Sequence, residues 1–235
     1  MNEQARMIAH RLSARRAGTR LVTLILLAGL PMLAHAQPLL ATGPEAEITV
    51  DGLHRVAPSI MDAAWVVPNL NLTRYNELYL RPTGVSFRAV AGAANRAGRR
   101  IEQTEFPITD EHKLAMRTDF EQAFREEFSA IAASPVSTVP GRRVLMVQGF
   151  LVDVVSSLPP DEPGSEFIQN LSWETTIVLE LRDSMSDNIL ARTVERERVQ
   201  EIVDSDFVRE QIRQLTHRWG RLLHTRFDEL SAIAR

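Results

Sequence analysis

"LELRDSMSDNILARTVERER", residues 179–198, alternates apolar and charged side chains, breaks at a polar cluster and then alternates again. Alternation with a period of two is typical of a strand that has one face toward a core and the other toward water. The polar cluster is rich in Ser, Asp and Asn, which favour turns because their side chains hydrogen-bond to the nearby backbone. The stretch therefore predicts an antiparallel β-hairpin that carries a ladder of Arg and Glu on one face.

The charges of the ladder predict the register of this hairpin. If Glu180 lies opposite Arg192, then Glu174 lies opposite Arg198, and the two strands present opposite charges to each other. A slip by one residue would place Glu174 against Glu197 and would turn the apolar positions to the wrong face. Each opposed pair contributes only about 0.2–1 kcal/mol, so the ladder specifies register more than it adds stability. We expect the ladder to be a solvated hairpin face; the alternative is a binding surface.

Two further glutamates, Glu195 and Glu197, fit the ladder less well. The same register turns them toward the side of Ile177 and Thr175, where apolar contacts are expected. We therefore expect this end of the sheet to lie beyond the helices, so that both carboxylates contact water.

Further strands are predicted on both sides of the first helix. Residues 142–158 are mostly apolar, which is typical of a central strand buried on both faces, with Gly149 as a possible bulge. Residues 77–90 alternate as a strand, but Pro82 lacks a backbone N–H and therefore confines the strand to an edge or interrupts it. Residues 48–56 predict a short strand with a turn.

Two long helices follow from apolar stripes with helical spacing. The first has Thr109 or Asp110 as its cap and ends before Ser134, and the second starts at Asp204 or Ser205. Their stripes are Phe120, Phe124, Phe128 and Ile131 in the first helix, and Val208, Ile212, Leu215, Trp219, Leu222 and Leu230 in the second. Such stripes are typical of a core. The order of elements predicts an α+β fold, with a single mostly antiparallel sheet and two long helices packed on one face.

The first 36 residues are typical of a secretory signal peptide. Residues 1–20 carry five Arg and one Glu, and the 13-residue apolar run "LVTLILLAGLPML" precedes an A-x-A motif that ends at Ala36. As a helix, this run rises only about 20 Å, which is too short to cross a hydrocarbon core of ~30 Å. We expect cleavage after Ala36, a flexible leader at residues 37–47 and a single α+β domain at residues 48–235, located in the periplasm.

The composition disfavours several partners and sites. Removing the five Arg and one Glu of the basic N-terminal segment from 27 Lys+Arg and 30 Asp+Glu leaves 22 basic and 29 acidic residues. This acidic balance disfavours nucleic acid as a partner. Cysteine is absent, which excludes disulfides, thiolate metal sites and a lipidated Cys. We expect no nucleic-acid partner and no direct membrane anchor after cleavage.

The sequence contains no recognisable nucleophile or phosphate motif. There is no G-x-S-x-G elbow, and "GAANRAG", residues 92–98, lacks the Lys and Ser/Thr of a phosphate loop. His217 and His224 are seven positions apart on a predicted helix, about 10 Å along its axis, which is too far to share a metal. We therefore predict no catalytic, cofactor-binding or metal-ligating residue, and no cofactor.

Clusters of acidic residues favour structural roles. Asp183, Asp187 and Asn188 suggest calcium, but their stretch lacks the Gly and the Glu of an EF-hand loop, so a hairpin turn is favoured. Asp204 and Asp206 resemble a carboxylate pair, but negative charge is favourable at a helix N-terminus. We expect both groups to stabilise local backbone rather than to bind a ligand.

Four blocks of the sequence together resemble a known bacterial family. They are "DAAWVVPNLNLTRYNELYL", "GRRVLMVQGFLVDVVSSLPPD", "LELRDSMSDNILARTVERER" and "LTHRWGRLLHTRFDEL". They look like the envelope family named domain of unknown function 3313, and "LRDSMSDNILAR" and the Trp-centred final helix carry most of the likeness. The resemblance covers nearly all of the chain after the signal segment and implies the same α+β fold. It implies no catalytic residues, and many relatives are lipoproteins, whereas this chain has no Cys to lipidate.

These observations favour a non-catalytic accessory or binding protein of the bacterial cell envelope. Its partner would be another envelope protein, with the sheet edge near Pro82 or the loop of residues 159–167 as the contact. An experimental test is recovery of a stoichiometric envelope protein from intact cells.

Two alternatives remain open. A carboxylate-dependent hydrolase acting on envelope glycans or esters would use the abundant acidic residues, and it would need two carboxylates about 5–10 Å apart in a cleft. The candidates are Glu174, Glu195 and Glu197. A carrier of a small apolar ligand would instead need an internal cavity between sheet and helices, lined by the stripe of Phe120, Phe124 and Phe128.

Overall fold

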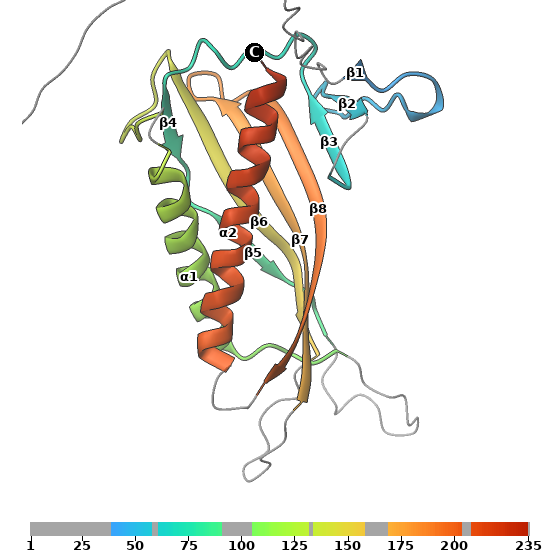
Figure 1. The fold of residues 1–235 in the computed structure, drawn as a ribbon, viewed down its shortest axis with the longest axis vertical. Helices are drawn as coiled ribbons and strands as arrows, with labels where there is room; N and C mark the ends of the chain where they lie inside the picture. Colours follow the sequence, from blue (N-terminus) through green and yellow to red (C-terminus); the bar gives the residue numbers. More distant parts are fainter. Residues whose placement is uncertain are drawn as a thin grey trace, which may run out of the picture. The chain divides into compact units, whose positions relative to one another are not determined.

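A long antiparallel hairpin lies at the centre of an eight-stranded sheet (Figure 1). Its strands are β7 (Gln169–Asp183) and β8 (Ile189–Val203). Glu180 lies opposite Arg192 and Glu174 lies opposite Arg198, so the register predicted from the charges is confirmed. The strands lie in the order β1 (Leu39–Leu40), β2 (His54–Ala57), β3 (Ala63–Val66), β8, β7, β6 (Val144–Ser156) and β4 (Glu77–Leu80), and β5 (Gly84–Phe87) also pairs with β6.

The computed structural model describes residues 39–57, 61–90, 105–131, 134–157, 169–203 and 208–234. These residues all belong to one compact unit, Ala36–Arg235. The predictions that lie outside the described residues are the signal peptide, the "GAANRAG" stretch, the loop of residues 159–167, and the helix start at Asp204, Ser205 and Asp206.

Two short strands form one edge of the sheet. β4 (Glu77–Leu80) and β5 (Gly84–Phe87) both run parallel to β6 (Val144–Ser156). They are separated at Pro82, as its missing N–H predicts. The remaining named strand pairs are antiparallel, so the predicted α+β class with a mostly antiparallel sheet is confirmed.

The bulge predicted at Gly149 is wrong. The pairing of β6 with β7 is regular there and shifts around Asp153, which has φ +62°. A Cβ on Gly149 would instead lie 2.6 Å from Leu223 Cδ1 and 3.2 Å from Phe124 Cδ2. Glycine is therefore required at this position because two helices approach the sheet closely.

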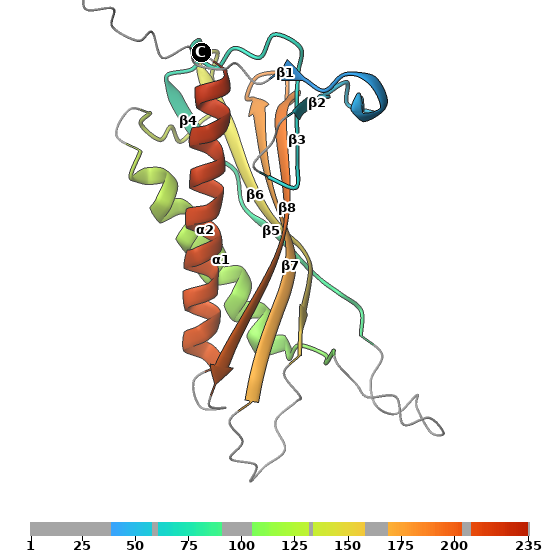
Figure 2. The ribbon, with the colours of Figure 1, turned by 45° about the vertical axis from the view of Figure 1, so that its right-hand side comes forward.

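Helices α1 (Asp110–Ser129) and α2 (Val208–Ile233) cover one face of the sheet (Figures 1 and 2). We call this the inner face and the opposite one the outer face. Thr109 caps α1, because its Oγ1 accepts a hydrogen bond from the backbone N–H of His112 at 3.2 Å. α1 ends at Ser129, before Ser134 as predicted, but the prediction that Ile131 belongs to this helix is wrong.

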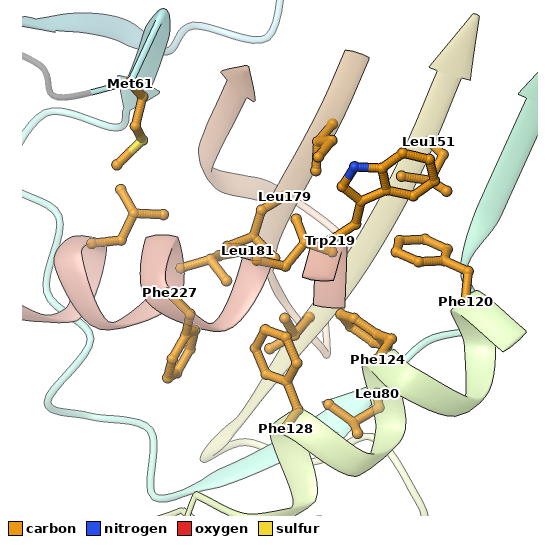
Figure 3. Close-up of a cluster of buried hydrophobic side chains, with 14 of the residues drawn as sticks. Met61, Leu80, Phe120, Phe124, Phe128, Leu151, Leu179, Leu181, Trp219 and Phe227 are labelled. Carbon is orange, nitrogen blue, oxygen red and sulfur yellow. The ribbon is translucent and has the colours of Figure 1, made fainter. Parts of the chain in front are cut away.

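The core lies between the two helices and the inner face (Figure 3). Phe124 and Phe128 contact each other at a ring-centroid distance of 4.6 Å, and Phe128 meets Phe227 of α2 at 5.6 Å. On α2 the buried stripe continues through Leu223 and Phe227, whereas the predicted Leu222 is only partly buried. Four residues beyond Trp219 is Leu223, so the helical period itself accounts for this difference.

The N-terminal part of the described chain adds three strands to the other edge. They are β1 (Leu39–Leu40), β2 (His54–Ala57) and β3 (Ala63–Val66), with a 3₁₀ helix, η1 (Gly43–Glu45), between the first two. The turn before β2 contains Gly52 at φ +77°, where a residue without Cβ is favoured. Part of the segment predicted as a leader is therefore hydrogen-bonded into the sheet.

Candidate functional site: an arginine–carboxylate cleft

The outer face carries the charged ladder as two separate groups. Alternate residues of β7 and β8 point to this face, and the pair Val178 and Val194 lies between the charges. The charged positions on the two strands are Glu174, Glu180, Arg182, Arg192, Arg196 and Arg198. Glu180 and Glu174 each form ion pairs with a different set of arginines.

The first group is centred on Glu180. Its Oε1 accepts a hydrogen bond from Arg192 Nε at 2.7 Å, and its Oε2 accepts one from Arg182 Nη2 at 2.6 Å. Arg192 also donates to Asp51 Oδ2 at 3.0 Å. Glu180 is only 6% exposed, so the prediction of a solvated ladder is wrong for this carboxylate. The arginines cover it and carry the contact with water themselves.

The second group is centred on Glu174, whose side chain is 12% exposed. Its Oε2 accepts from Arg198 Nη2 at 2.7 Å, and its Oε1 accepts from Arg196 Nε at 3.0 Å. Arg88 lies on the other side, with Nη2 3.6 Å from Glu174 Oε1. Arg88 also donates to Asp153 Oδ2 at 2.5 Å and to Glu105 Oε1 at 2.6 Å. We call these six residues the Arg88 cluster.

The bulge in β6 brings the Arg88 cluster together. Asp153 sits at positive φ, where Asp is tolerated better than most residues. Its backbone N–H donates to Ser86 Oγ at 3.2 Å, and the N–H of Arg88 donates to Val154 O at 2.9 Å. The segment after β5 is thereby held beside the bulge, which places the Arg88 guanidinium between Asp153 and Glu174.

The arginines lower the pKa of two carboxyl groups of the cluster, Glu174 and Asp153. Hydrogen bonds from Arg196 and Arg198 lower the pKa of Glu174 below its ordinary value. A hydrogen bond from Arg88 likewise lowers the pKa of Asp153. A general acid at neutral pH needs a raised pKa, so neither carboxyl group is suited to donate a proton.

A cleft of about 430 Å³ opens beside the Arg88 cluster. Its lining is mostly polar and consists of Glu105, Val155, Ser156, Ser157, Ser172, Glu174 and Arg198. The hydroxyl groups of Ser157 and Ser172 hydrogen-bond to each other at 3.0 Å. The cleft thus offers hydroxyls and fixed charges of both signs, which can hydrogen-bond a polar partner.

The three carboxylates named for a hydrolase do not meet in one cleft. Glu174 is on the outer face, whereas Glu195 and Glu197 are on the inner face. Glu195 accepts two hydrogen bonds from Arg226 of α2, at 2.7 and 2.8 Å, and Glu197 lies 3.9 Å from Arg218. The expectation that this end of the sheet lies beyond the helices is therefore wrong, because α2 is long enough to cover it.

The acidic cluster between β7 and β8 is a turn, as predicted. Asp183 Oδ1 accepts hydrogen bonds from the backbone N–H groups of Met185 and Ser186, and Asp187 adopts φ +58°. Asp183 Oδ2 also accepts from the Tyr75 hydroxyl at 2.8 Å. Asp183 therefore caps local backbone and binds a neighbouring tyrosine, whereas the Asp187 carboxylate accepts a hydrogen bond from Arg81 Nη1 at 3.0 Å.

The histidines of α2 face acidic residues rather than each other. His217 Nδ1 lies 3.9 Å from Glu126 of α1, and His224 Nδ1 lies 3.8 Å from Glu127. Within the described ranges, no group of three or more metal-ligating side chains is found.

The phenylalanine stripe of α1 packs into the core. Phe120, Phe124 and Phe128 are completely buried against α2 and the sheet (Figure 3). A second cleft of about 210 Å³ lies near the ends of both helices and includes Leu72, Ile131 and Phe227 in its lining. Neither this cleft nor the cleft beside the Arg88 cluster has Phe120, Phe124 or Phe128 in its lining.

The sheet edge near Pro82 is largely occupied by the chain itself. The N–H of Leu78 donates to Pro135 O at 3.0 Å, and the N–H of Ser137 donates to Leu78 O at 2.7 Å. The N–H of Thr83 donates to Glu121 Oε2 at 2.7 Å. This edge therefore offers few free backbone groups to a partner.

Sequence reasoning missed most of the Arg88 cluster. Arg88, Glu105 and Asp153 come from three separate segments, and Arg88 reaches Asp153 and Glu174 through the parallel pairing of β5 with β6. One signal was present in the sequence, because Asp153 interrupts an otherwise apolar strand. A charged residue in such a strand requires a charged partner or a bulge.

Comparisons with known proteins identify no family. No family model matches the chain, so the resemblance to the domain of unknown function 3313 family is not confirmed, and no curated protein matches it either. Among the described residues, no helix has the length and apolar composition that crossing a bilayer requires.

Several solved bacterial structures are distantly similar. The PelC dodecamer from Paraburkholderia phytofirmans is 8% identical, with 73% of this chain and 94% of that chain covered and a TM-score of 0.34. A minor lipoprotein from Acinetobacter baumannii is 11% identical, with coverages of 65% and 92% and a TM-score of 0.30. A Xanthomonas campestris protein of the DUF330 family is 13% identical, with coverages of 69% and 92% and a TM-score of 0.34. These TM-scores are too low to support an argument about function.

Proposed function

We propose that this protein is a non-catalytic binding protein of the bacterial cell envelope, and that the cleft beside the Arg88 cluster contacts its partner. The partner class is another envelope protein that inserts a polar segment into the cleft. The N-terminal segment, with its basic region and apolar run, supports export. The observation that carries the proposal is the cleft itself, in which hydroxyl groups and ionised side chains of both signs converge.

The electrostatics of the cleft support binding over hydrolysis. Glycoside hydrolysis by two carboxyl groups needs one of them protonated as the general acid. The pKa of Glu174 is lowered by Arg196 and Arg198, and Glu105 is ion-paired with Arg88. Fixed charges that are already paired favour a rigid surface with complementary hydrogen bonds.

Site-specific photo-crosslinking in intact cells tests this proposal. A photo-reactive residue at Ser172, in the cleft, should yield one abundant crosslinked product that contains a different envelope protein. The same residue at Leu114 is the control, because Leu114 is 65% exposed on α1, away from the cleft lining. The proposal is overturned if Ser172 and Leu114 give the same products, or if Ser172 gives none.

A charge-neutral variant sharpens the same test. Glu174→Gln keeps the shape of the side chain but removes the charge that holds Arg196 and Arg198. Recovery of the partner in a pull-down should fall severalfold, while the circular dichroism spectrum of the variant stays unchanged. Unchanged recovery would contradict a role for the cleft.

A further inference from the structure

One edge of strand β8 is paired over its whole length, whereas the other edge is paired over only a few residues. β7 pairs with β8 from one end to the other, Gln169 with Val203 through to Arg182 with Ile189. On the opposite side, β3 pairs only with residues 191–194 of β8. Among the described residues, no strand pairs with this side of residues 195–203. Figure 1 shows the far half of β8 extending past β3.

Beyond β3, this edge of β8 carries backbone groups that no described strand pairs with. Leu190 O accepts a hydrogen bond from the N–H of Val67 next to β3, so even-numbered residues of β8 point their backbone to this side. The N–H of Arg196 donates to Asp62 Oδ2 at 2.8 Å. Beyond it, the backbone N–H and C=O groups of Arg198 and Gln200 face outward. Such an edge is a template for another strand.

Charged side chains often block an open edge, but here they are tied back. Arg196 and Arg198 lean over β7 and donate hydrogen bonds to Glu174. Glu195 is held by Arg226 on the inner face. The guanidinium and carboxylate groups are therefore drawn away from the edge, and an incoming strand would not have to displace them.

We propose that this edge of β8 pairs antiparallel with the same edge of a second copy of the chain, about a two-fold axis at Gln200. A two-fold interface places each residue opposite one fixed residue of the other copy. With the axis at Gln200, Arg198 faces Ile202, and Glu197 faces Val203. Val199 lies opposite Glu201 in this register. Every charged residue of residues 197–203 then has an uncharged residue opposite.

Neighbouring axis positions are worse because they oppose like charges. An axis at Val199 places Glu197 against Glu201 of the other copy. An axis at Glu201 places Glu201 against itself, and an axis at Arg198 places two arginines face to face. Like charges directly opposite each other destabilise a strand pair. Among axes at residues 198–201, only the axis at Gln200 avoids opposed like charges, so this edge can pair with the same edge of a second copy without charge repulsion.

Disulfide trapping tests the pairing directly, because the chain has no Cys. Gln200 would form a hydrogen-bonded antiparallel pair with its own copy, at a Cα–Cα distance of about 5.5 Å. This distance lies within the disulfide range of about 4.4–6.8 Å. Mild oxidation of Gln200→Cys should therefore give a covalent dimer in high yield.

Arg196→Cys is the matched control for disulfide trapping. Arg196 is on the same strand and the same face, and its side chain is 65% exposed. In the proposed register it lies far from its own copy, so this variant should remain monomeric on a non-reducing gel. Equal dimer yields from the two variants would overturn the register.

Charge variants at Gln200 distinguish a second copy from any other occupant. Gln200→Lys and Gln200→Glu each place like charges on the axis, and the dissociation constant measured by sedimentation should rise up to about fivefold. An equimolar mixture of the two variants should associate at least as well as the wild type. The proposal is overturned if the mixture associates no better than either variant, or if the wild type is monomeric at high micromolar concentration.

Discussion

The two faces of the sheet are built by the same strands but stabilised by different interactions. On the inner face, Trp173, Leu179 and Leu181 pack against α1 and α2 and are almost fully buried. On the outer face, the alternate residues Glu174 and Glu180 are covered by arginines. Because successive side chains alternate between the faces, one of two adjacent residues of β7 contributes apolar contacts and the next contributes ion pairs. Apolar burial should dominate stability, and the ion pairs should mainly fix geometry.

Truncation in the core should have the largest effect. Phe124→Ala removes a completely buried ring at the contact between α1 and α2, and we expect a loss of about 3–5 kcal/mol in the free energy of unfolding. Leu114→Ala on the same helix is the control, and it should cost less than about 0.5 kcal/mol because the side chain is exposed. Urea denaturation measures both, and similar costs would contradict the assigned inner face.

Overfilling the inner face should have the next largest effect. A side chain at position 149 would collide with Leu223 Cδ1 and the ring of Phe124, so Gly149→Val should cost about 1–3 kcal/mol. Adding Leu223→Ala removes the nearest obstacle. The double variant should therefore lose less free energy of unfolding than the two single variants lose together, as measured by a double-mutant cycle. Strict additivity would show that the close approach is absent.

On the outer face, Glu180 should be coupled to Arg192 more strongly than Glu174 is coupled to Arg198. A double-mutant cycle for Glu180→Ala and Arg192→Ala should give a coupling of about 1–2 kcal/mol, because Glu180 is excluded from water. The pair Glu174 and Arg198 should give about 0.2–1 kcal/mol, because the Arg198 side chain is 64% exposed. Equal coupling energies would contradict the difference in burial between the two groups.

The smallest effect should appear in the pH dependence of stability. The folded-state pKa of Glu174 lies below its ordinary value of 4.5, so its contribution is fully present above pH 4.5 and is lost as the pH falls through the lowered pKa. The wild type should have a slightly higher melting temperature than Glu174→Gln at pH 7. This difference should vanish in acid. A difference that persists unchanged to pH 2 would contradict the lowered pKa.

The sequence predicts elements well where neighbouring residues decide the structure. The register of β7 and β8 follows from alternation and from charges only a short distance apart in the chain, such as Glu180 and Arg192. The cap at Thr109 follows from one side chain and the helix that comes directly after it. In both cases the stabilising contacts are local, and the pattern of residue types is enough to specify them.

The candidate site could not be predicted because it depends on contacts between distant segments. The position of Arg88 depends on β5 lying parallel to β6, and the bulge at Asp153 depends on Ser86 and Arg88. The inner-face partners of Glu195 depend on where α2 crosses the sheet. None of these placements leaves a periodic signal in the sequence, because one residue at each position is enough to create the contact.

The strand order has a consequence for how the chain folds as it is synthesised. β6, β7 and β8 are consecutive in sequence and adjacent in the sheet, so their loops can close early at a small cost in chain entropy. β3 is made much sooner, but its partner is β8, near the other end of the described chain. We predict that pulsed hydrogen exchange during refolding will protect the amides of β7 before those of β3. The strands that are synthesised first would then be the last to pair in the sheet. β3 would stay exposed to proteases and chaperones until β8 has formed.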